Sequence, residues 1–147
     1  MNPPISTLLE QKGAAVRTVP SSMTVAQAVR EMNHFKIGAV LVVDGARIVG
    51  IFTERDVLTR VVAMELDPKS MPVTAAMTPQ PMTVPPETTV QTVMEIFTEK
   101  HFRHLPVVKD GRLFGVISIG DVTRWVANAH RLEAEHLRQY VHGGLST

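Results

Sequence analysis

Residues 18–62 and 83–127 of this 147-residue chain are two copies of one segment, aligned without a gap at a spacing of 65 residues. Each copy carries the signature Gly-x-x-Ser/Thr-x-x-Asp, at Gly50–Asp56 in the first copy and at Gly115–Asp121 in the second. A repeat at fixed period constrains the architecture before any local pattern is considered. Two copies are too few for a solenoid, so we expect a pseudo-symmetric pair of units with a ligand cleft between them.

The composition excludes several classes of function. Fifteen basic and fourteen acidic residues are interleaved along the chain, so there is no basic stripe and nucleic acid is not an expected partner. The absence of cysteine removes disulfides, thiol catalysis and thiolate metal sites.

The N-terminal residues 1–4 have neither a basic region nor an apolar run, which argues against a signal peptide. The longest apolar run, residues 39–43, is far shorter than the roughly 20 residues that span a bilayer. We therefore expect a cytoplasmic protein with no membrane partner.

The first copy alternates between strand and helix patterns. Val25, Ala28, Val29 and Met32 form one apolar face at helical spacing, which predicts a helix over about residues 25–35. The remaining elements predicted here are an opening strand at 16–19, a hairpin of strands 39–43 and 47–52, and a helix over about 54–64 with Val57, Leu58, Val61 and Val62 as apolar positions.

The second copy repeats this order. Val90, Val93, Met94 and Phe97 give its first helix the same apolar face. The hairpin strands are predicted at 105–108 and 113–117, and the second helix at about 119–128. Each copy therefore reads as a β-α-β-β-α unit.

These elements predict an α+β fold, with α/β-like units related by a pseudo-twofold axis and packed through their sheets. The predicted divisions are an N-terminal lead-in at 1–15, one unit at 16–66, a linker at 67–80, a second unit at 81–128 and a C-terminal helix and tail at 129–147. The lead-in is expected to contain one helical turn around Thr7–Leu9. Gly143-Gly144 is expected to end the tail helix, which either packs on its own domain or contacts a partner.

The chain resembles paired cystathionine β-synthase (CBS) domains, which are regulatory modules. The resemblance covers about residues 16–127 and rests on residues 81–90, 103–108 and 115–122, with 37–45 and 50–57 in the first copy. It implies a stand-alone pair whose two clefts bind an adenosine-containing ligand: AMP, ADP, ATP, NAD or S-adenosylmethionine. It also implies a homodimer and a regulated partner protein.

The resemblance further implies roles for particular residues. Asp56 and Asp121 would hold ribose hydroxyls, while Thr53 and Ser118 would face the phosphates. The residues implied to surround adenine are Thr18, Val19, Ile37, Gly38 and Ile51, with their second-copy partners Thr83, Val84, Phe102, Arg103 and Val116.

The residues themselves support this assignment in part. A carboxylate can accept two hydroxyl hydrogen bonds, and a strand-to-helix junction favours an anion. However, Thr53–Asp56 and Ser118–Asp121 also fit capping boxes, which only start helices. Gly50 and Gly115 lie within apolar strands, where a missing side chain often marks a close approach of backbone.

Nearby cations differ between the copies, so the two sites are expected to be inequivalent. In the resembling family, the residue at the position of Arg103 reaches phosphates of the ligand held by the other copy. We therefore expect Arg103 and His104 to serve the Asp56 site. Arg55 and Lys36 would serve the Asp121 site.

No motif for catalysis stands out, and we predict neither an enzyme nor a catalytic cofactor. His101 and His104 are spaced at i, i+3, but solvated or stacked histidines are the default interpretation, and no metal site is predicted. The alternative to a nucleotide sensor is a scaffold or dimerisation module whose pockets are vestigial.

Overall fold

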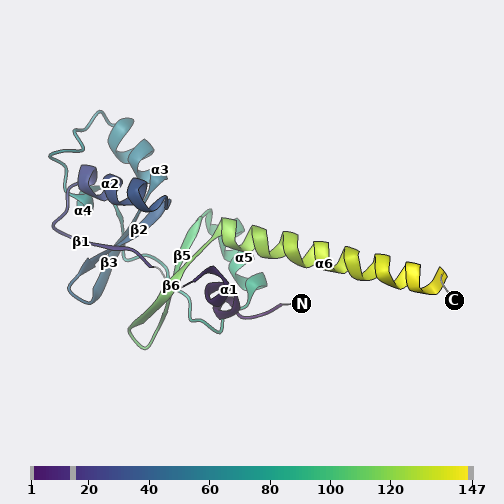
Figure 1. The fold of residues 1–147 in the computed structure, drawn as a ribbon. Helices are drawn as coiled ribbons and strands as arrows, with labels where there is room; N and C mark the ends of the chain where they lie inside the picture. The colour runs from purple at the N-terminus through teal and green to yellow at the C-terminus, as the bar shows by residue number, and fades with distance from the viewer. Residues whose placement is uncertain (1, 14–15, 146–147) are drawn as a thin grey trace. The chain divides into compact units, whose positions relative to one another are not determined.

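The computed structural model describes residues 2–13 and 16–145. Two compact units divide the chain (Figure 1). The first unit is Ala15–Thr83, and the second unit combines Met1–Ala14 with Val84–Thr147. Each unit mixes helices with strands, which confirms the α+β fold class.

A four-stranded sheet forms the first unit, in the order β1-β2-β3-β4. β1 (Thr18–Pro20) is parallel to β2 (Ala39–Asp44), and α2 (Val25–Phe35) connects them. β3 (Arg47–Thr53) is antiparallel to β2 through a tight turn in which Gly45 has a φ of 62°. β4 (Thr78–Pro79) adds a short antiparallel strand to the other edge of β3.

The helix predicted over residues 25–35 is confirmed by α2. It begins with a capping box in which the Thr24 side chain accepts from the Gln27 N–H, and it ends at Lys36, which has a left-handed φ of 55°. Its apolar face packs against the sheet in a core that contains Val25, Ala28, Met32, Val40, Val42 and Phe52. Apolar periodicity was sufficient here because one helix face meets one sheet face.

The segment after β3 differs from the prediction of one α-helix over 54–64. α3 (Glu54–Asp56) gives way to a π-helical turn, η1 (Val57–Val62), in which the Ala63 N–H donates to the Leu58 carbonyl at 2.9 Å. The wider turn directs Val61 into the core and leaves Leu58 and Val62 more than half exposed. The predicted apolar face is therefore wrong at these two positions.

The second unit contains a hairpin between two helices. β5 (His104–Lys109) and β6 (Arg112–Ser118) form a two-stranded antiparallel sheet, preceded by α5 (Val90–Lys100). α6 (Ile119–Leu145) follows β6 directly. The opening strand predicted near residue 84 is reduced to an isolated parallel bridge between Val84 and Val107.

Each unit also contains a helix from the segment that precedes the other copy. α4 (Val73–Ala76), which lies in the predicted linker, packs in the first unit, and Pro72 at its start bridges to Thr24. α1 (Ile5–Lys12), which lies in the predicted lead-in, packs in the second unit.

The placement of α1 matches that of α4. Pro4 bridges to Thr89, just as Pro72 bridges to Thr24. The Ile5 N–H donates to the Thr88 carbonyl at 2.7 Å, as the Val73 N–H donates to the Met23 carbonyl at 2.9 Å. The structural repeat therefore includes these two helices, although they lie outside the copies that the sequence aligns.

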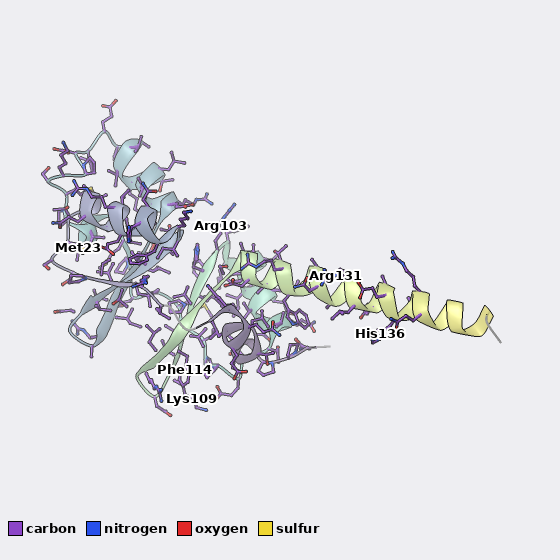
Figure 2. The ribbon with its side chains drawn as sticks, in the orientation of Figure 1. Met23, Arg103, Lys109, Phe114, Arg131 and His136 are labelled. Atoms are coloured by element: carbon purple, nitrogen blue, oxygen red, sulfur yellow. The ribbon has the colours of Figure 1, made fainter. Side chains whose placement is uncertain are left out.

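The C-terminal helix runs without a break from the second unit. α6 continues through Gly143-Gly144, so the predicted stop at these glycines is wrong. All side chains from 130 to 139 are exposed, which contradicts the interpretation in which this stretch packs on its own domain. Figure 2 shows Arg131 and His136 on this stretch, away from the β5–β6 hairpin that carries Lys109 and Phe114. No helix within residues 2–13 and 16–145 has both the length and the apolarity that a membrane span requires.

Candidate functional site

The first-unit signature places Asp56 one helical turn after the end of β3. Asp56 is 7% exposed, and its Oδ2 accepts a hydrogen bond of 2.9 Å from the Thr53 backbone N–H. The Thr53 hydroxyl also donates to Oδ2 at 3.2 Å and accepts from the Asp56 N–H at 3.4 Å. The two residues therefore form the capping box that the sequence offered as the alternative to a ligand site.

The other carboxylate oxygen of Asp56 is less engaged. Its Oδ1 lies 3.6 Å from Nε of Arg60, which is an ion-pair distance rather than a short hydrogen bond. Arg60 directs its Nη1 donor to the Met77 carbonyl at 2.7 Å instead. Asp56 thus keeps one oxygen that can accept a hydroxyl.

Asp121 occupies the equivalent place in the second unit. It is also 7% exposed, and its Oδ2 accepts from the Ser118 N–H at 2.8 Å while Ser118 Oγ accepts from the Asp121 N–H at 3.1 Å. Arg124 donates to Oδ1 at 2.5 Å, one helical turn along α6. Ser118 and Asp121 therefore form a second capping box. Arg124 bonds to Oδ1 of Asp121, the oxygen that does not take part in this box.

A second cation reaches Asp121 from α1. Lys12 Nζ donates to Asp121 Oδ2 at 2.9 Å and to the Val116 carbonyl at 3.0 Å. Burial raises the pKa of the Asp121 carboxyl, but the hydrogen bond from Lys12, the Ser118 N–H and the Lys12 charge together outweigh burial and hold the pKa below its ordinary value. The carboxylate in the second unit is therefore firmly ionised and more crowded than Asp56.

Backbone contacts bring the residue before each hairpin beside its own signature. The Gly38 carbonyl accepts from the Glu54 N–H at 3.1 Å, and the Arg103 carbonyl accepts from the Ile119 N–H at 2.9 Å. Two first-turn N–H groups of each signature are thus already bonded, one to this carbonyl and one to the capping hydroxyl. An incoming phosphate would have to compete for these donors.

Strand pairing within each unit places some of the residues predicted to surround adenine on neighbouring strands. In the first unit Thr18 and Ile51 both pair with Leu41, one from each side. In the second unit Val84 bonds to Pro106, which pairs with Val116, and His104 pairs with Ser118 across the hairpin.

The remaining predicted residues vary in burial. Val19 is buried, Ile37 packs against the core, and the exposed residues are Lys36, Arg55, Thr83, Phe102 and Arg103. Figure 2 shows Arg103 at the start of the β5–β6 hairpin, at the opposite end from Lys109. The expected pairing of Arg103 and His104 with Asp56, and of Arg55 and Lys36 with Asp121, joins different units and stays a prediction.

Three residues at the two carboxylates were missed from the sequence: Lys12, Arg60 and Arg124. Arg60 and Arg124 could have been found, because each lies one helical turn after its aspartate. Lys12 could not, since 109 positions separate it from Asp121. Within the described part of the chain, no cluster of three or more His, Asp or Glu side chains is suited to hold a metal.

Known proteins resemble this chain in sequence and in fold. The family model described as CBS domain matches twice, over residues 13–63 and 73–128. The "CBS domain-containing protein CBSX3, mitochondrial" of Arabidopsis thaliana is 40% identical over 126 residues, which are 82% of this chain and 61% of that protein. The chain therefore spans about three fifths of the length of this relative.

Solved structures that resemble this chain are also of CBS domain proteins. A CBS-domain containing protein from Agrobacterium tumefaciens is 38% identical with a TM-score of 0.78, and the match covers 82% of this chain and 97% of that one. A CBS domain protein from Pyrobaculum aerophilum, complexed with AMP, is 30% identical with a TM-score of 0.72, and the match covers 80% of this chain and 88% of that one.

Proposed function

The chain belongs to the CBS domain family, whose members are regulatory modules, and we propose that it senses an adenine nucleotide or a related adenosyl ligand. The ligand classes are AMP, ADP and ATP, with NAD and S-adenosylmethionine as further candidates. Ligand binding would be signalled to a regulated partner protein through a change in the packing of this chain. Such signalling requires that the ligand bind two conformations of the chain with different affinities.

The observation that carries the proposal is the pair of buried signature aspartates. Each carboxylate is held in place by backbone N–H bonds at a strand end, and Asp56 keeps an oxygen that can accept a ribose hydroxyl. A related CBS protein complexed with AMP supports the ligand class. We assign ribose binding to Asp56 and Asp121, with adenine near the strands that carry Thr18, Ile51 and Val116.

The phosphate group would be met by side chains of both units. We propose that Arg103 and His104 serve the ligand held by Asp56, and that Arg55 and Lys36 serve the ligand held by Asp121. Thr53 and Ser118 face the phosphates in this proposal, and their hydroxyls must then release their capping contacts.

We also propose that the protein is a homodimer. The exposed stretch of α6 supports this, because an unsupported helix of this length is marginal in water. Leu132 and Leu137 are exposed on it by 51% and 66%, and a second copy would cover them.

The test is isothermal titration of the purified chain with AMP, ADP, ATP, NAD and S-adenosylmethionine, with GMP as a control for the base. We expect heat with at least one adenosyl ligand and none with GMP. Asp56→Asn should remove one site, whereas Asp44→Asn, at an exposed aspartate of the same unit, should change nothing.

The scaffold alternative makes the opposite prediction. A vestigial pocket would give neither heat nor a rise in melting temperature at millimolar ligand. Asp56→Asn and Asp121→Asn would then leave assembly and partner binding unchanged, and the sensor proposal would be abandoned.

A further inference from the structure

The two halves of α1 are held in different ways. Ile5 and Leu8 bury the first half in the core of the second unit. In the second half of α1 and the residue after it, residues 10–13 are exposed. Lys12 attaches this half to the rest of the unit through its bonds to Asp121 and to the Val116 carbonyl. Among the described residues, Lys12 therefore supplies the polar side-chain attachment of the second half of α1.

Leu9 supplies the apolar packing of this half of the helix, which otherwise borders a cavity. The volume of the cavity is about 620 Å³, and its walls include Leu9, Glu10 and Gly13 from α1 and Phe114 from β6. A helix end flanked by open space and held by a few polar contacts belongs to the low-stability part of a fold.

The first unit lacks this attachment. After α4, Met77 packs against Gly50 and the chain continues directly into β4. In the second unit, Leu9 contacts Gly115 as Met77 contacts Gly50 in the first. There the chain remains helical after this contact, as far as Lys12. Among the described residues, the cation that pairs with Asp56 is Arg60, which lies on its own helical segment.

The second-unit carboxylate is occupied on both oxygens, by Arg124 on Oδ1 and by Lys12 and the Ser118 N–H on Oδ2. Lys12 also holds the carbonyl of Val116, a residue predicted to lie beside adenine. Its ammonium therefore lies among the residues assigned to the second ligand site.

We propose that Lys12 is a displaceable competitor for this site, so that ligand binding at Asp121 releases the second half of α1. The inference rests on the proposed function, because it assigns the ribose hydroxyls to Asp121. Ribose hydroxyls need acceptor positions on a carboxylate whose Oδ2 is bonded to Lys12 and whose Oδ1 is bonded to Arg124, and displacing Lys12 frees one position on Oδ2. The linkage is reciprocal, so holding α1 in place weakens binding at Asp121 and leaves the Asp56 site unaffected.

The test uses the full chain with AMP as the probe, and Asp56→Asn to leave only the Asp121 site. Adding Lys12→Met removes the ammonium and keeps an unbranched side chain. We expect AMP to bind about threefold to sixfold more tightly, since the attachment is a partly exposed ion pair. Lys109→Met is the matched control, because Lys109 is an ion-paired lysine of the same unit that does not contact Asp121.

Hydrogen exchange gives an independent measurement on the wild-type chain, which also covers the case in which Asp56→Asn destabilises the protein. AMP should raise exchange at the amides of residues 9–13 severalfold and leave residues 5–8 unchanged. In Lys12→Met these amides should exchange rapidly without AMP.

The outcomes separate the inference from the function on which it rests. If the wild type binds AMP with Asp121-dependent heat, but Lys12→Met binds equally or more weakly and exchange at residues 9–13 does not change, the inference is wrong and the proposed function stands. If AMP gives no heat but another of the five adenosyl ligands does, that ligand replaces AMP as the probe and the same outcomes apply. If the wild type binds none of the five at millimolar concentration, the inference and the proposed function fail together.

Discussion

Gly50 lies directly beneath the segment that joins α4 to β4, where a Cβ atom on Gly50 would come within 2.9 Å of the Thr78 carbonyl and also collide with the Met77 side chain. The glycine of the first signature is therefore required by close packing of backbone on backbone, as the sequence predicted. In the second signature the equivalent atom would meet only the flexible end of Leu9, at 3.0 Å.

We expect Gly50→Ala to destabilise the first unit by about 1–3 kcal/mol, because the Thr78 backbone must move to make room. The measurement is urea unfolding followed by circular dichroism. Gly120→Ala is the control: its nearest neighbour would be 3.6 Å away, and alanine is favoured in a helix. Equal stability of the Gly50→Ala chain and the wild type would contradict this packing.

The ion pair between Lys12 and Asp121 should make stability depend on pH. Because the pKa of Asp121 is lowered by folding, its contribution is present above the ordinary aspartate pKa of about 3.9 and is lost as the pH falls through the lower folded value. At neutral pH, Lys12→Met should cost about 0.5–1 kcal/mol, a small value because the lysine is partly exposed.

This difference should vanish once the carboxyl is protonated, at a pH well below its ordinary pKa. Urea midpoints of the wild type and Lys12→Met at neutral and acidic pH check the expectation. Lys100→Met, at an exposed position on α5, controls for the loss of a lysine charge. A gap between wild type and Lys12→Met that persists unchanged in acid would show that Lys12 stabilises the fold by other means.

The exposed leucines of α6 should decide the oligomeric state. Replacing Leu132 and Leu137 by glutamate puts charges where a second copy is expected to pack, so sedimentation should change from dimer to monomer. Each unit should keep its fold, which circular dichroism would show, because neither leucine packs in the core of a unit.

Gln139→Glu adds a charge on the same helix without removing apolar surface, and it should remain dimeric. A wild-type chain that sediments as a monomer would remove the basis for this interface. A double variant that stays dimeric would place the dimer contact elsewhere.

Local patterns predicted the local elements well. The apolar faces of residues 25–35 and 90–97 located two helices, although Met94, predicted on the second face, is 41% exposed. The π-helical turn after Asp56 was not predictable in this way. Val57, Leu58, Val61 and Val62 fit an α-helix as well as a π-helix, and the choice is made by backbone hydrogen bonds.

Long-range placement could not be read from the sequence. Pro4-Ile5 and Pro72-Val73 occupy equivalent places, yet they are 68 residues apart rather than 65 and so fall outside the gapless alignment. Only packing shows that α1 belongs with the second copy. The position of Lys12 at Asp121 depends on that placement, whereas the two signature aspartates were visible from the repeat alone.

The most direct test of the account is a crystal structure after soaking in excess AMP. We predict a nucleotide whose ribose hydroxyls bond to Asp56, with a second one at Asp121 only where Lys12 has moved away. Crystals in which both aspartates keep only the contacts seen here, to Thr53 and Arg60 and to Ser118, Lys12 and Arg124, with no nucleotide bound, would contradict it.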